Sequence, residues 1–218
     1  AFTGSVDNVL TESGVIAQIQ SERAPTTLQY FHRETDQNGQ FGLFDFNVIE
    51  DNASIQSGIR IATNQRLDIT YTFDHIQESQ PDFSDDYDTH DGNFVHTLNF
   101  GEENLDQLRS SLRFYSQTGE ADTTDARWDE FLILRHNEHL ETRYNFSADD
   151  QSARGQSQRL LRGDAQIRHW LFDSLISSAT VGGGTFDADN ATTDDMFILG
   201  SLDYTKKVYM GRIDSSVS

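Results

Sequence analysis

The sequence predicts an all-β fold, an up-and-down antiparallel meander that closes into a barrel, and three observations lead to this prediction. Segments of about nine to eleven residues alternate between apolar and polar side chains, which is the period of a strand with two different faces. The joints between these segments are alternately short and long, and the long ones are acidic. Both prolines, Pro25 and Pro81, fall in joints, as expected of a residue that cannot donate to a strand ladder.

Twelve strands are expected along the chain. The clearest hairpin connects the segment 55–62 to the segment 67–76 across a short joint at 63–66. In its second strand Leu67, Ile69 and Tyr71 lie on one face, and the residues between them are polar. An even number of strands is typical of bacterial membrane barrels. The other segments with this alternation are 15–22, 28–33, 94–100, 108–115, 128–135, 140–147, 161–168, 175–181, 198–204 and 209–215.

Short turns and long loops are expected at opposite ends of the strands, which is the pattern of a transmembrane β-barrel. Short turns are predicted near Pro25, at 63–66, at 102–106, near Asn137, at 171–173 and at 206–207. Long joints are predicted at 34–53, 77–93, 118–125, 149–158 and 185–195, although 41–49 is apolar enough to form a strand. The acidic residues assigned to these loops are Asp82, Asp85, Asp86, Asp88, Asp91, Glu120, Asp122, Asp125, Asp187, Asp189, Asp194 and Asp195.

Composition excludes several classes of partner. The chain has 218 residues, enough for one domain, with 16 Lys and Arg against 36 Asp and Glu, a net charge of −20. A nucleic-acid partner needs a basic surface, so none is expected. Docking onto an anionic membrane surface is disfavoured for the same reason. Cysteine is absent, which excludes disulfides and thiolate metal sites, and no apolar run approaches the roughly 18 residues of a transmembrane helix.

The arginines favour a barrel over a soluble β-sandwich, in which the apolar face would instead be buried in a core. Fourteen arginines but only two lysines occur, and most of the arginines fall on the polar faces of strands, between carboxylates. A crowded polar lumen favours the planar guanidinium, which bonds carboxylates on neighbouring strands. The residues expected to line the pore are Arg60, Asp68, Arg109, Arg113, Asp129, Arg135, Glu141, Arg143, Arg162, Asp164 and Arg168.

Three stretches carry a resemblance to a known group of proteins. The cadence of RLDITYTFDHIQ, LETRYNFSADD and HWLFDSLISSATVGGG resembles the large Gram-negative outer-membrane β-barrels, many of them uncharacterised and some porin-like. The resemblance is one of strand and loop style over nearly the whole chain and implies location in the bacterial outer membrane. Such proteins commonly end in an aromatic residue, whereas this sequence ends in Ser218, so residues 1–218 are expected to be either one barrel domain or an excerpt of a larger barrel.

Other candidate sites are weak. Asp86, Asp88 and Asp91 form an oxygen-rich cluster that is a weak candidate for a calcium site, but the EF-hand spacing is not matched, and a solvated acidic loop explains them better. The seven histidines are scattered and are expected at the surface or the membrane interface. No G-x-S-x-G motif occurs, so we expect neither an enzyme nor a cofactor.

The function expected from these observations is porin-like passive passage of ions or small polar solutes through the outer membrane. The expected partners are membrane lipid, the solutes themselves, and either further copies of the chain or a protein seated in the lumen. The alternative is a secreted soluble β-sandwich, a binding or structural module with acidic ligand-binding loops. Solubility without detergent separates the two hypotheses.

Overall fold

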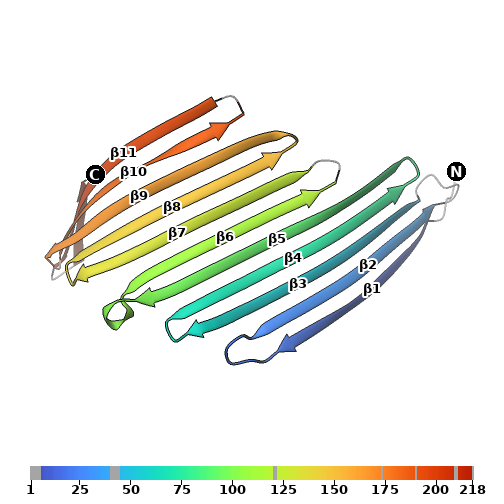
Figure 1. Cartoon of the computed structure of the whole chain (residues 1–218), viewed down its shortest axis with the longest axis horizontal. Helices are drawn as coiled ribbons and strands as arrows, with labels where there is room; N and C mark the ends of the chain where they lie inside the picture. The colour runs from blue at the N-terminus through green and yellow to red at the C-terminus, as the bar shows by residue number, and fades with distance from the viewer. Residues whose placement is uncertain are drawn as a thin grey trace.

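The computed structural model describes residues 6–39, 45–119, 122–172, 174–189, 191–208 and 211–217, which form one antiparallel sheet (Figure 1). Its strands follow one another in chain order, which confirms the prediction of an all-β, up-and-down fold with twelve strands. The strands are β1 (Val6–Ile19), β2 (Thr26–Gly39), β3 (Phe46–Ala62), β4 (Gln65–Gln80), β5 (Phe83–Phe100), β6 (Asp106–Thr118), β7 (Thr123–Asn137), β8 (Leu140–Ala153), β9 (Gln156–Phe172), β10 (Leu175–Ala188), β11 (Ala191–Val208) and β12 (Gly211–Val217). A short 3-10 helix, η2 (Glu102–Asn104), lies between β5 and β6.

The strands are longer than the sequence pattern predicts, and the joints are short at both ends of the sheet. The predicted loop 77–93 is wrong: β4 continues to Gln80, β5 begins at Phe83, and Gln80 pairs with Phe83. The period-2 signal disappears there because both faces of the strands become polar while the backbone pairing continues. The long loops predicted at 149–158 and 185–195 are wrong for the same reason, and 118–125 contains the ends of β6 and β7. The loop predicted at 34–53 is also wrong, because β2 continues to Gly39 and β3 begins at Phe46, within the stretch 41–49 that is apolar enough to form a strand.

Most of the acidic residues assigned to loops therefore lie on strands. Asp85, Asp86, Asp88 and Asp91 belong to β5, for example. Glu120 lies outside the described residues, as does Tyr209 in the last predicted strand. One of the two-residue joints that replace the loops consists of Arg154 and Gly155, with φ of 52° and 77°. Two positive φ values match the twist of a hairpin, and glycine adopts them without strain.

Strand register divides the side chains between two faces. Ile55 on β3 lies opposite Tyr71 on β4, and Ile69 on β4 lies opposite Phe94 on β5. Every second residue shares this side of the sheet, which we call the apolar face, and the residues between them form the polar face. On the polar face Arg113 of β6 lies opposite Arg127 of β7.

No second layer covers the apolar face in the described part of the chain. None of its described hydrophobic side chains is buried, and Met196 and Ile198 are 75% and 72% exposed. Because a β-sandwich is defined by two sheets packed on a common core, the alternative fold is wrong for these residues. Figure 1 shows a single curved sheet with β1 and β11 at opposite sides. No described helix is long and apolar enough to cross a bilayer.

The apolar face changes character along each strand. On β8 it is apolar or aromatic at Tyr144, Phe146 and Ala148, and it becomes polar at Asp150 and Ser152. The same change follows Phe73 on β4, and β11 is polar at its start, before Met196. We call the two parts the apolar band and the polar extension. The extension lies at the end of the sheet that carries the turns at 81–82 and 154–155.

Candidate functional site on the polar face

All eleven residues predicted to line a pore lie on the polar face. Pairing connects them across strands: Glu141 of β8 lies opposite Arg135 of β7 and Arg168 of β9. The prediction missed Arg66 and Arg127, which share this face. Arg66 was assigned to a turn, although it has the same parity as Asp68 on β4 and is the second residue of that strand.

Ion pairs on this face follow two geometries. In the first, an arginine contacts a carboxylate two positions away on its own strand: Arg66 Nη2 lies 2.6 Å from Asp68 Oδ1. Arg127 Nε lies 2.9 Å from the Oδ2 of Asp129 in the same way. In the second, the pair crosses strands, as where Arg113 Nη2 of β6 lies 3.3 Å from an oxygen of Asp91 on β5. These contacts tie down three of the long side chains.

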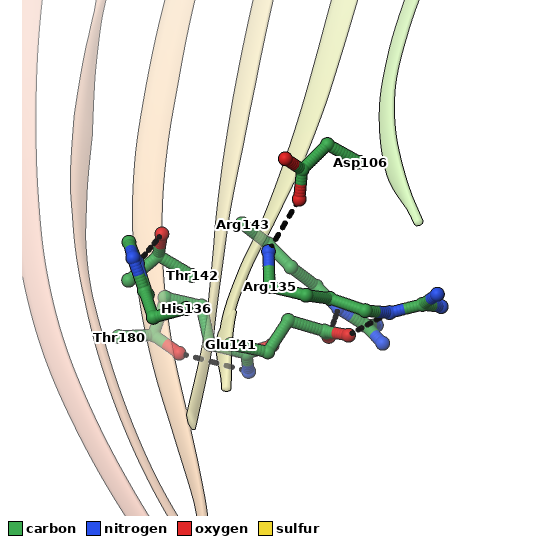
Figure 2. Close-up of polar contacts among 8 residues, drawn as sticks. Asp106, Arg135, His136, Glu141, Thr142, Arg143 and Thr180 are labelled. Atoms are coloured by element: carbon green, nitrogen blue, oxygen red, sulfur yellow. Dashed lines mark hydrogen bonds and ion pairs between the residues drawn. The ribbon is translucent and has the colours of Figure 1, made fainter. Parts of the chain in front are cut away.

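Glu141 is the most buried charged group that the structure describes, at 4% exposure (Figure 2). Its two carboxylate oxygens accept hydrogen bonds from Arg135 Nε at 3.3 Å and from Arg143 Nε at 2.5 Å. Asp106 of β6 supports the cluster by accepting the backbone N–H of Arg135 at 2.7 Å. Charge-assisted bonds of this kind fix side-chain geometry. We call Arg135, Glu141 and Arg143 the Glu141 cluster.

Four other arginines of the polar face have no ion pair within the described residues. Arg60 and Arg109 are exposed and contact no described carboxylate. Arg162 lies with its guanidinium 5.6 Å from the centroid of the Phe197 ring, and Arg168 lies 5.3 Å from that of Trp170. Contacts over an aromatic face hold a guanidinium in place without neutralising its charge.

Two hollows open on this part of the sheet. The Glu141 cluster and the turns beside it surround a hollow of about 650 Å³. A second hollow, of about 490 Å³, spans β4 to β7 on the polar face. Hydroxyl, amide, carboxylate and guanidinium groups surround this second hollow, so it offers both donors and acceptors to a polar solute. Its lining residues are Thr70, Thr72, Asp91, Asn93, Ser111, Arg113, Arg127 and Asp129.

Charge is unevenly distributed along the polar face. Behind the apolar band, nine arginines stand against the six carboxylates of Asp68, Asp91, Asp129, Glu141, Asp164 and Asp203, a net charge of +3. Towards the polar extension the sign reverses, with carboxylates at Glu12, Glu50, Asp74, Glu78, Asp85, Asp125, Asp149 and Asp195. The nine arginines are Arg60, Arg66, Arg109, Arg113, Arg127, Arg135, Arg143, Arg162 and Arg168.

The weak calcium candidate does not assemble. Asp86 and Asp88 lie on one face of β5 and Asp91 lies on the other, so the three carboxylates cannot converge on one ion. No group of three metal-ligating side chains forms within the described residues.

A row of histidines and aspartates instead crosses the polar extension, on the side of the apolar face. His32, Asp51, His75 and Asp88 are direct neighbours on β2 to β5. His32 Nδ1 lies 2.9 Å from Asp51, and His75 Nδ1 lies 2.8 Å from Asp88. The hydrogen bond with Asp88 raises the pKa of His75 above its ordinary value, against the opposing effect of desolvation. Sequence reasoning missed this row because its members come from four strands whose register the pattern does not reveal.

Comparison with known proteins gives little beyond this geometry. No protein-family model matches the chain, and no curated protein matches it. Among solved structures, the chain is similar to a loop L8 deletion mutant of OmpT, an outer membrane protein of Vibrio cholerae. The identity is 7% and the TM-score 0.38, over 90% of this chain and 98% of that one. A similarity at this TM-score carries no functional inference, and the fold described above rests on strand pairing alone.

Proposed function

We propose that this chain forms an outer-membrane β-barrel whose polar face surrounds a water-filled lumen and allows passive passage of ions or small polar solutes. One observation carries the proposal: the sheet has an uncovered apolar band on one face and a charged, hydrogen-bonded surface on the opposite face. In water such a sheet would expose its leucines and isoleucines, at a cost of roughly 25 cal/mol for each Å² of apolar surface. Lipid outside and water inside satisfy both faces.

The dimensions support a membrane location. The apolar band runs from Leu140 to Ala148 on β8 and from Met196 to Tyr204 on β11, nine residues in each case. A tilted transmembrane strand needs about 9–11 residues. In a bilayer every backbone polar group must be paired, so the outer edges of β1 and β12 have to be joined. Their closure on each other gives an even number of strands, as bacterial barrels have.

The proposed partners follow from the two faces. Lipid chains contact the apolar band, and water, ions and small polar solutes contact the polar face. The same polar face accommodates a protein seated in the lumen, and the band accommodates further copies of the chain. The proposal gives no residue a catalytic role and needs no cofactor.

A matched pair of substitutions on β7 tests the membrane location. Leu132 lies in the apolar band, and Thr124 lies on the same face of the same strand in the polar extension. Leu132→Arg is expected to lower the free energy of unfolding from a bilayer by about 2–4 kcal/mol, and Thr124→Arg by about 0–1 kcal/mol, because the cost of arginine depends on depth. Equal costs, or a monomer that is soluble without detergent, would remove the proposal. Single-channel recording in a planar bilayer tests passage directly.

A further inference from the structure

We infer that the lumen selects small anions, chiefly oxyanions such as phosphate and carboxylates, at a patch of five arginines on β3 to β7. This inference rests on the proposed function and names its solute class. The residues are Arg60, Arg66, Arg109, Arg113 and Arg127, which we call the arginine patch. It forms one side of the polar face, behind the apolar band.

The patch places like charges side by side. Arg60 lies directly opposite Arg66, and Arg113 lies directly opposite Arg127. Arg109 shares the row of Arg60 and Arg66, with only Thr97 of β5 between. Like charges in directly opposed positions destabilise a sheet. An anion bound between the guanidiniums relieves that repulsion.

Neutralisation of the patch is incomplete. Asp68, Asp91 and Asp129 each contact one of its arginines, whereas Arg60 and Arg109 contact no described carboxylate. Five guanidiniums and three carboxylates leave a net charge of +2. The side chains of Arg66 and Arg113 remain 66% and 57% exposed despite their ion pairs, so their remaining N–H donors face the solvent.

The hollow of about 490 Å³ beside Arg113 and Arg127 gives an anion room and further donors. The hydroxyl of Ser111 and the amide of Asn93 lie in its wall together with these two guanidiniums and with the carboxylates of Asp91 and Asp129 that pair with them. A guanidinium presents a planar fork of N–H groups that matches the paired oxygens of a carboxylate or phosphate. Chloride is attracted by the same positive charge, but it has no paired oxygens to match the guanidinium fork.

The net charge of −20 does not oppose this selectivity, because most of the carboxylates lie outside the arginine patch. Asp86, Asp88 and Asp187 of the polar extension lie on the outer side of the sheet. Those on the lumen side, such as Asp85 and Asp125, lie at its mouth, where salt screens charges beyond about 8 Å. Within the membrane, low-dielectric walls strengthen the field of the arginines.

Reversal potentials in a planar bilayer under a potassium chloride gradient test the inference. The wild type is expected to show a chloride-to-potassium permeability ratio of about 3 or more, because a local potential of one kT or more enriches anions by that factor. The double variant Arg60→Gln, Arg109→Gln removes the two unneutralised guanidiniums and is expected to lower the ratio towards 1. Arg154→Gln, in the β8–β9 turn, is the matched control and is expected to change nothing.

Inorganic phosphate provides a second measurement that needs no variant. Millimolar phosphate is expected to reduce chloride current through the wild type by competing for the patch. A conducting wild type that is cation-selective, or that phosphate leaves unchanged, would overturn the inference while leaving the pore intact. Absence of any conductance would overturn the proposed function itself. A heat-modifiability gel establishes that the double variant is folded before its ratio is compared.

Discussion

Glu141→Gln tests whether the polar face stabilises the barrel as well as lining it. The carboxylate is 4% exposed and accepts from both Arg135 and Arg143, at 3.3 and 2.5 Å. Glutamine retains the size of the side chain but loses its charge, and its amide nitrogen points a donor at one of the two guanidiniums. One charge-assisted bond is therefore replaced by a repulsive contact, and the other becomes a weaker neutral one.

The magnitude follows from the exposure of the partners. Breaking a fully buried ion pair costs about 3–5 kcal/mol, whereas an exposed pair is worth about 0.2–1 kcal/mol. Arg135 and Arg143 are 44% and 33% exposed, so solvent compensates them in part once Glu141 is neutral. The expected loss of unfolding free energy is about 1.5–3 kcal/mol, between these limits.

Urea unfolding in detergent micelles or bilayers, followed by the fluorescence of Trp128 and Trp170, measures this loss. Glu138→Gln is the matched control, because Glu138 is an exposed carboxylate in the adjacent turn. Its substitution is expected to change stability by less than about 0.5 kcal/mol. If Glu141→Gln and Glu138→Gln have equal effects, the Glu141 cluster contributes nothing measurable, and the argument from burial is wrong.

Two further predictions concern the polar extension. Because the pKa of His75 is raised in the folded protein, its contribution to stability is complete below the unfolded pKa near 6.5 and is lost as the pH rises through the higher folded pKa. Between pH 6 and 9 the urea midpoint of the wild type should therefore fall more than that of His75→Gln. Parallel curves for the two proteins would contradict this. Gly155 has a φ of +77°, and a Cβ added there would meet no other atom, so Gly155→Ala should lower the free energy of unfolding by about 1–2 kcal/mol through backbone strain alone. The measurement is a lower midpoint in thermal unfolding. An unchanged midpoint would mean that the turn relaxes.

The parts of the fold that the sequence predicts correctly are those that the apolar band determines. Where Leu67, Ile69 and Tyr71 alternate with polar residues, the alternation shows both that the segment is a strand and which side chains share a face. The eleven predicted lining residues accordingly lie on one face of the sheet. Beyond Phe73 the strand has polar residues on both faces, so the pattern resembles that of a solvated loop although the hydrogen bonding continues to Gln80. The alternation of apolar and polar residues reveals a strand only where its two faces meet different environments. Where both faces meet water, the sequence pattern does not show that the strand is paired.

Contacts between side chains on different strands are harder to predict from the sequence. The bond between His75 and Asp88 depends on how many residues the β4–β5 turn contains, because a shift of one residue moves a side chain to the other face. The cluster around Glu141 likewise depends on the irregular register between Arg135 and Asn137. Arginine and carboxylate content predicted that such pairs exist, but turn length decided which residues form them.

Strand length, rather than loop length, distinguishes the two ends of this sheet, and it predicts the orientation of the proposed barrel. At one end the apolar band reaches the turns, with Phe100 and Leu140 beside them; at the other, the polar extension lies between band and turns. The extended end corresponds to the longer, extracellular side of outer-membrane barrels.

Because the chain contains no cysteine, a single introduced cysteine shows on which side of the membrane its turn lies. On intact cells, an impermeant maleimide is expected to label Arg154→Cys in the extended end and to leave Thr63→Cys, in the turn between β3 and β4, unlabelled until the outer membrane is permeabilised. Labelling of Thr63→Cys alone would reverse the orientation, and equal labelling of both on intact cells would be incompatible with a chain that spans the membrane.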